Sequence, residues 1–134
     1  MATIFTKIIN GEIPCYKVAE KEHFFAFLDI APMTKGHTLV IPKFEADNEG
    51  DYIFDMDDEM YAGLMMFAKQ VAKAIEAAVP CKRVGVAVMG MEVPHVHVHL
   101  IPMNSEKDMV ISNPKLKLEA SEMAEIAANI AAKL

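Results

Sequence analysis

The sequence predicts one α+β domain built around an antiparallel sheet of five strands. Five short segments rich in β-branched and aromatic residues are bounded by turn signals, and one long segment repeats apolar residues at helical spacing. The strands come in pairs with helices segregated between them, which is typical of an α+β fold. A chain of 134 residues can bury a hydrophobic core, so we expect a single domain over residues 1–134.

The first half of the chain predicts a short helix and three strands. In TIFTKII the apolar residues share one helical face, and Asn10-Gly11 is a turn signal that ends the helix. The segments YKVAE and HFFAFLD predict a hairpin. The loop APMTKG then leads to a third strand, HTLVIP, which ends at Pro42, and EADNEGD predicts a polar loop.

The second half predicts one long helix, two strands and a C-terminal helix. Asp55 or Asp57 can cap the long helix, and Pro80 ends it. Its core-facing stripe consists of Met60, Leu64, Phe67, Val71, Ile75 and Val79. RVGVAVM and HVHVHLIP are the fourth and fifth strands, SNPKLKLE is irregular, and SEMAEIAANIAAKL is the last helix.

Charge and composition exclude several classes of protein. The net charge is −6 and no Lys/Arg cluster occurs, which argues against a nucleic-acid partner but not against a small phosphorylated substrate. No apolar run reaches the ~18 residues that a membrane span needs, and the N-terminal segment, which contains Lys7, lacks the features of a signal peptide. We therefore expect a cytoplasmic protein without a membrane partner, in which Cys15 and Cys81 are free thiols.

Residues 94–102, PHVHVHLIP, contain three histidines in strict alternation: His95, His97 and His99. On a strand these rings share one face at a spacing of roughly 6–7 Å. That spacing is too long for all three rings to hydrogen-bond one another, but it suits several rings around one small group such as a phosphate. The residues expected on the opposite, core-facing side are Val96, Val98 and Leu100.

Two kinds of chemistry fit this row of histidines. A His-x-His pair on a strand is a common zinc arrangement, although the flanking sequence offers only Glu92 and Asn104 as further ligands and no cysteine. Alternatively, a neutral imidazole is a good nucleophile toward phosphorus when its other nitrogen donates to a fixed acceptor. Flanking imidazoles can then hold phosphate oxygens and assist the leaving group.

The motif HVHVHLIP matches the H-x-H-x-H signature of the histidine triad (HIT) superfamily of nucleotide hydrolases and transferases. The segments IFTKIINGEIP, FFAFLDIAP and KGHTLVIPK resemble further parts of that family, in the expected order. The chain is most similar to the Hint-like branch, which hydrolyses purine nucleoside phosphoramidates. The resemblance implies a five-stranded HIT-like sheet, a homodimer, a purine nucleotide substrate and no cofactor.

The resemblance also implies a role for each site residue. His97 is the nucleophile that attacks the α-phosphorus and forms a nucleotidyl-imidazole intermediate, and His99 binds phosphate oxygens and assists the leaving group. His95 supports the geometry and charge of the site, His37 approaches from the neighbouring strand, and Asp29 accepts both ribose hydroxyls. The residues expected to enclose the base are Ile4, Phe5, Ile8, Phe27 and Ile30.

Three alternatives stay open beside the phosphoramidase. The chain could be a dinucleoside polyphosphate hydrolase of the same superfamily, a nucleotide-binding sensor with little turnover, or a zinc-binding protein that uses the histidine row. Measurements of turnover would separate an enzyme from a sensor, and metal analysis would identify the zinc-binding protein.

The sequence departs from the family pattern at two places. Many relatives carry an Asn and a Gly-Gln pair that contact phosphate before the triad, but here Met91 follows Gly90 and no Asn is present. We expect a backbone N–H of this stretch to replace the missing donor, the alternative being a slow hydrolase. The cysteines that bind zinc in some bacterial relatives are replaced by Thr3 and Thr6, so a structural metal is not expected. The helix face expected to support a homodimer carries Gly63, Met66, Gln70, Lys73 and Ala77.

Overall fold

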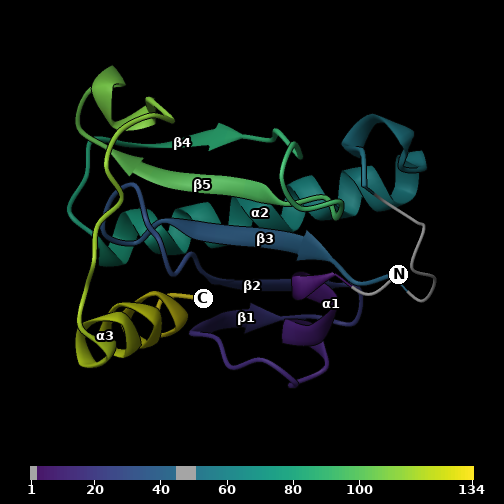
Figure 1. The fold of residues 1–134 in the computed structure, drawn as a ribbon, viewed down its shortest axis with the longest axis horizontal. Coiled ribbons are helices and arrows are strands. Elements are labelled where there is room, and N and C mark those ends of the chain that lie inside the picture. Colours follow the sequence, from purple (N-terminus) through teal and green to yellow (C-terminus); the bar gives the residue numbers. More distant parts are fainter. Residues whose placement is uncertain (1–2, 45–50) are drawn as a thin grey trace.

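The computed structural model describes residues 3–44 and 51–134 and has the predicted five-stranded antiparallel sheet (Figure 1). The polar loop predicted at EADNEGD lies almost wholly outside the described residues. In the sheet the strands follow the order β1-β2-β3-β5-β4, and every neighbouring pair is antiparallel. The strands are β1 (Lys17–Glu20), β2 (Phe24–Leu28), β3 (Thr38–Pro42), β4 (Arg83–Ala87) and β5 (Val98–Met103).

The three predicted helices are present as α1 (Ile4–Ile9), α2 (Asp58–Ala78) and α3 (Ala120–Ala131). The side chain of Asp57 caps α2 by accepting the backbone N–H of Met60 at 2.8 Å. The other candidate cap, Asp55, lies in a short 3₁₀ turn, η1 (Ile53–Asp55), which the sequence did not predict. A second unpredicted 3₁₀ turn, η2 (Glu106–Met109), follows β5.

The main core lies between α2, α3 and one face of the sheet (Figure 1). Of the predicted stripe on α2, the four central residues are buried and the two terminal ones, Met60 and Val79, are partly exposed. Alternate residues of the central strands complete this core, including Ala26, Val40 and Val98, each of which is fully buried.

The opposite face of the sheet carries α1 and a smaller apolar cluster. Its buried members are Phe5, Ile8, Phe25, Phe27, Leu39 and Ile41. Because Phe27 pairs with Leu39, and Leu39 pairs with His99, these side chains share this face of the sheet. Asp29 lies two residues beyond Phe27, and His37 lies two residues before Leu39. The register therefore brings Asp29, His37 and His99 together at one end of this face.

The predicted fifth strand is too long at its start. β5 begins at Val98, so His95 and His97 precede the regular strand. The register between β3 and β5 extends only to the pair Val40 and Val98, and the N–H of His95 donates to the carbonyl of Val93 at 2.8 Å, which bends the chain. The predicted core-facing residues of this segment are nevertheless buried: Val96, Val98 and Leu100.

Within the described residues, α2 and α3 cover one side of the sheet, and no helix combines the length and the apolar character that crossing a membrane requires. Both cysteines, Cys15 and Cys81, are free thiols, as expected.

Candidate catalytic site

A cavity of about 450 Å³ lies where the strands β2, β3 and β5 meet the loop before the triad. Its lining comes from four segments of the chain, within residues 29–37, 89–92, 97–99 and 111–115. The lining residues are Asp29, Ala31, Met33, His37, Met89, Gly90, Met91, Glu92, His97, His99, Ile111 and Lys115. A larger cavity of about 690 Å³ between α2 and β1 is lined by Lys21, Phe67 and Lys73 among others, but it contains none of the predicted site residues.

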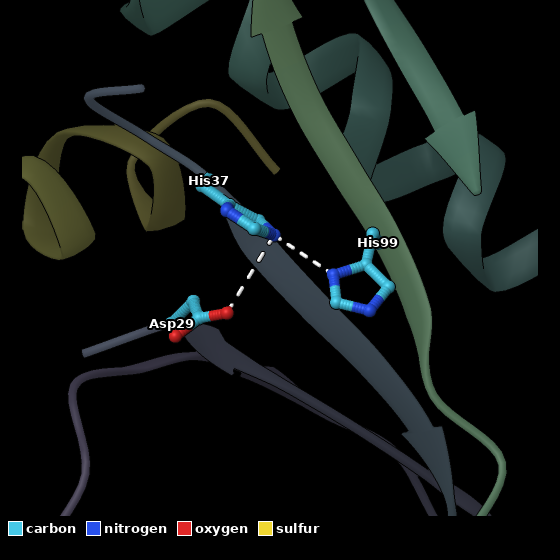
Figure 2. Close-up of side chains that lie close together, drawn as sticks. All are labelled: Asp29, His37 and His99. Atoms are coloured by element: carbon cyan, nitrogen blue, oxygen red, sulfur yellow. Dashed lines mark hydrogen bonds and ion pairs between the residues drawn. The ribbon is translucent and has the colours of Figure 1, made fainter. Parts of the chain in front are cut away.

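His37 and His99 form a direct hydrogen bond whose direction is set by the backbone. The N–H of Met33 donates to Nδ1 of His37 at 3.0 Å, so this nitrogen carries a lone pair and the proton of neutral His37 is on Nε2. That Nε2–H donates to Nδ1 of His99 at 3.0 Å (Figure 2). The proton of neutral His99 is consequently on its own Nε2, which lies on the side of the ring away from His37 (Figure 2).

Burial keeps both rings of this pair uncharged. His37 is 2 % exposed, and desolvation, followed by the charges of His99 and Lys115, lowers its pKa to about 3. Desolvation, with a smaller effect from His97, lowers the pKa of His99 to about 4. Since both values lie well below 7, the Met33–His37–His99 hydrogen-bond chain is neutral at physiological pH and has one defined set of donors.

His97 has the opposite tautomer. Its Nδ1–H donates to the carbonyl oxygen of His95 at 2.7 Å, because a carbonyl can only accept. Nε2 of neutral His97 therefore carries a lone pair. The ring is buried, borders the cavity, and packs edge-on against Phe5 with the ring centroids 5.0 Å apart. This is the arrangement that a histidine nucleophile requires.

His95 anchors the segment and does not line the cavity. Its Nε2–H donates to the carbonyl of Pro42 at 2.7 Å, and the hydroxyl of Thr3 donates to its Nδ1 at 3.3 Å. Thr3 also caps α1 through the N–H of Thr6. Desolvation lowers the pKa of His95, although the bond to Pro42 opposes this effect. The first triad histidine thus connects the end of β3 to the first helix.

Asp29 uses its two carboxylate oxygens differently. Oδ1 accepts the N–H of Ala31 at 2.9 Å and closes the turn after β2. Oδ2 lies 3.7 Å from Nε2 of His37, whose single proton is already donated to His99 (Figure 2). Burial raises the pKa of Asp29, while the bond from Ala31 opposes this rise. Oδ2 is the oxygen that remains available to a ligand.

The five residues expected to enclose a base lie beside the site but do not line the cavity. Three of them, Phe5, Ile8 and Phe27, are buried in the small cluster under α1. Ile4 and Ile30 are 47 % and 73 % exposed. Their role in binding a base stays a prediction.

Sequence reasoning missed the wall of the cavity that comes from residues 111–115. The N–H of Leu116 donates to the carbonyl of Pro32 at 2.8 Å, which fastens this irregular segment beside the turn after β2. Ile111 and Lys115 thereby reach the cavity. No local pattern in SNPKLKLE signals this contact, since it depends on one backbone hydrogen bond between segments about eighty residues apart.

One group of side chains in this site has the spacing of a metal site. Ligand atoms of Asp29, His37 and His99 lie within 4.8 Å of one another. However, Nε2 of His37 bears the proton that Met33 imposes on it, and a metal ligand must offer a lone pair there. His95 is also engaged at both nitrogens. The donor set therefore does not fit a zinc site built on the histidine row.

Comparison with known proteins identifies the class. The HIT domain family matches residues 10–106, and the chain belongs to the histidine triad family. It is 36% identical over 135 residues to the adenosine 5'-monophosphoramidase HNT1 of Saccharomyces cerevisiae, covering 99% of this chain and 83% of that protein. It is 37% identical over 137 residues to the adenosine 5'-monophosphoramidase hnt1 of Schizosaccharomyces pombe, covering 100% and 99%. These matches confirm the expected family and the expectation of an enzyme.

Solved structures of the family share this fold. A HIT-like protein of Bartonella henselae, described as involved in cell-cycle regulation and solved with an unknown ligand, superimposes with a TM-score of 0.82 at 31% identity, covering 98% of this chain and 96% of that one. A zinc-bound histidine triad protein of Mycobacterium smegmatis superimposes with a TM-score of 0.78 at 25% identity, covering 99% and 93%. The bound zinc is a feature of the Mycobacterium smegmatis protein.

Proposed function

We propose that this chain hydrolyses the bond between the α-phosphorus and nitrogen in purine nucleoside 5'-phosphoramidates, with His97 as the nucleophile. The observation that carries the proposal is the 2.7 Å hydrogen bond from Nδ1–H of His97 to the carbonyl oxygen of His95. This bond leaves the Nε2 lone pair of His97, whose ring lines the cavity, available for attack. The names of the two yeast relatives support the substrate class.

The reaction takes two displacement steps at phosphorus. The lone pair of His97 Nε2 forms a bond to the α-phosphorus while the phosphorus–nitrogen bond breaks, and its electron pair goes to the leaving nitrogen, which takes up one proton from solvent and departs as an amine. Water then attacks the phosphorus, the electron pair of the phosphorus–Nε2 bond returns to His97, and the water gives up one proton. One water is consumed, and a nucleoside monophosphate and an amine are released.

The neighbouring residues stabilise charge and position the substrate. Neutral His99 donates its Nε2–H to a phosphate oxygen or the leaving nitrogen, and His37 keeps it in that tautomer. Oδ2 of Asp29 accepts the ribose hydroxyls, and Ile4, Phe5, Ile8, Phe27 and Ile30 contact the purine. This preorganised set of donors needs little rearrangement when the transition state forms.

Replacement of the nucleophile tests the proposal. In His97→Ala, steady-state hydrolysis of adenosine 5'-phosphoramidate should fall by several powers of ten, because the covalent route is lost. Affinity for AMP should stay within about three-fold, since the expected ribose and base contacts are elsewhere. Added imidazole should restore some turnover to His97→Gly, and His23→Ala, on the exposed surface, is the matched control.

Acid quench followed by intact-protein mass measurement should show the nucleotidyl adduct in the wild type and not in His97→Ala. A His97→Ala variant that keeps most of the wild-type rate would disprove the covalent mechanism. A wild type that binds AMP but forms no adduct would favour the sensor. Faster turnover of dinucleoside polyphosphates than of phosphoramidates would favour the other hydrolase of the superfamily.

We also propose a cytoplasmic homodimer of single-domain chains spanning residues 1–134. Two features support the dimer: Met66 on α2 is 57 % exposed, and β4 is an edge strand with Val86 53 % exposed. Gly63 does not belong to the free face of α2, because a Cβ there would meet the ring of Phe24 at 2.8 Å. Light scattering at micromolar concentration should give the mass of two chains, and a monomer mass would contradict the proposal.

A further inference from the structure

We propose that Lys115 binds the phosphate of the nucleotide and supplies a positive charge to this cavity. The inference rests on the proposed function in one respect only, that the cavity accepts a nucleotide with its phosphate at His97. It assigns a binding role to a residue of the irregular segment after η2, outside the triad, the hairpin and the strands.

Lys115 is held at the cavity by its own segment. Its side chain lines the same cavity as His97 and His99. The ammonium Nζ donates to the carbonyl of Ile111 at 2.6 Å and to that of Asn113 at 2.9 Å. An ammonium has three N–H donors, so one remains for a ligand. The two bonds restrict a side chain that is otherwise flexible, which lowers the entropic cost of binding an anion.

The charges around the cavity show why a cation is needed there. Among its lining residues, all of which the structure describes, Asp29 and Glu92 are acidic and Lys115 is the one basic side chain other than histidine. His37 and His99 are neutral at pH 7, since burial lowers their pKa values to about 3 and about 4. Without Lys115, an anionic phosphate would enter a cavity with two carboxylates and no full positive charge from this pair.

The loop on the other side of the cavity offers no replacement side chain. Met89 and Met91 carry no hydrogen-bond donor, and Met91 is 89 % exposed. Among the residues that line this cavity, Lys115 is therefore the side chain that can offer an ammonium to a phosphate.

The phosphate can be isolated by comparing AMP with adenosine, which lacks it. Calorimetric titration of the wild type, Lys115→Gln, Lys115→Arg and Lys117→Gln with both ligands separates the phosphate from the nucleoside. Lys115→Gln should weaken AMP binding by about ten-fold and leave adenosine affinity within about two-fold, because only the phosphate is charged. Lys115→Arg should retain most of the AMP affinity. Lys117→Gln, an exposed lysine two residues away that does not line the cavity, should match the wild type for both ligands.

Salt provides an independent measurement. AMP affinity of the wild type should fall as KCl rises from about 20 to about 300 mM, and this dependence should be weaker in Lys115→Gln, since one screened charge pair is absent. With adenosine 5'-phosphoramidate, Lys115→Gln should raise KM more than it lowers kcat.

The proposal is overturned if Lys115→Gln binds AMP as the wild type does, or if it loses affinity for AMP and adenosine equally. Selective loss of turnover with unchanged AMP affinity would also overturn it, because it would place Lys115 at the leaving group. The titrations with AMP and adenosine require no turnover. If they give the expected result while the wild type fails to hydrolyse phosphoramidates, only the proposed function is wrong.

Discussion

Nε2 of His37 lies 3.0 Å from Nδ1 of His99, and the N–H of Met33 lies 3.0 Å from the other nitrogen of His37. A single backbone N–H therefore determines the tautomers of two imidazoles in succession. The bond from His97 to the carbonyl of His95 determines a third. Burial keeps the His37 and His99 rings neutral with defined donors and acceptors, which is the form of histidine that can donate a hydrogen bond to a ligand at pH 7.

These assignments predict the imidazole ¹⁵N spectrum of the protein. At pH 7 His37, His95 and His99 should show a protonated Nε2, and His97 should show a protonated Nδ1. The reason is that each ring faces a backbone group or a second ring that can act there only as a donor or only as an acceptor. Long-range ¹H–¹⁵N correlation on uniformly labelled protein measures this directly.

In His37→Ala the resonances of His99 should move toward a mixture of tautomers, because its Nδ1 loses the donor. His37→Gln is the matched control, since its amide can accept from Met33 and donate to His99. A wild-type His99 with a protonated Nδ1 would contradict the hydrogen-bond chain.

The lowered pKa of His37 predicts a pH-dependent stability. The unfolded chain has a histidine pKa near 6.5, whereas the folded value is about 3. Between these values the unfolded state binds more protons, so the contribution of His37 is present above about pH 6.5 and is lost as pH falls toward 3. From pH 7 to pH 5 we expect the free energy of unfolding to fall by about 2 kcal/mol through this residue.

Urea unfolding followed by circular dichroism at pH 7, 6 and 5 measures that slope. His37→Gln should show a smaller dependence than the wild type, whatever its absolute stability. His23→Gln removes a histidine from the exposed surface and serves as the control for histidine number. Equal slopes in the wild type and His37→Gln would show that His37 is not the responsible group.

Much of the fold was predictable because local patterns match the elements. The stripe through Leu64, Phe67 and Val71 faces the core because α2 lies along the sheet. Asp57 caps the N-terminus of α2, as its residue type and position predict. The start of β5 was not predictable. The alternation of His and Val runs unbroken from His95 to His99, whereas the strand begins only at Val98, where pairing with β3 begins.

The position of the candidate site was predictable where the family pattern covers it, while the roles of its residues stay predictions. The triad motif indicated His97 and His99, and the strand register then explains why Asp29 and His37 join them. The direction of the His37–His99 bond depends on Met33, which carries no chemical signal of its own. Lys115 was missed because its segment has no periodicity and is placed by the contact between Leu116 and Pro32.

Asp29 should make the enzyme prefer ribose to 2′-deoxyribose. Loss of a hydroxyl that a buried carboxylate binds costs about 1–3 kcal/mol, which corresponds to roughly five- to 150-fold in kcat/KM. Asp29→Ala should abolish the preference but also removes the acceptor for Ala31. Asp29→Asn retains one acceptor for that turn and should likewise reduce the preference while raising KM more than it lowers kcat. Steady-state kinetics with matched ribose and deoxyribose phosphoramidates give the ratio, and equal use of both by the wild type would refute the assignment.

Met91 provides a test of how this chain makes up for the amide that the family resemblance implies at this position. If a backbone N–H or Lys115 already serves the phosphate, Met91→Gln should change kcat/KM by less than about three-fold. A rise of ten-fold or more, about 1.4 kcal/mol, would instead indicate a slow hydrolase with a missing donor. Substitution of Gly90 discriminates less well, because its φ of +69° strains any other residue regardless of its contacts.

A double-mutant cycle separates the two replacements. In a Lys115→Gln background, Met91→Gln should raise kcat/KM by about five-fold or more if the new amide substitutes for the lost ammonium at the phosphate, since the two changes then act on one group. If a backbone N–H of the Met89–Met91 stretch is sufficient, Met91→Gln should have the same small effect in both backgrounds. The coupling between positions 91 and 115, measured on adenosine 5'-phosphoramidate with Lys117→Gln as the control background, therefore shows which part of the chain took over the phosphate contact.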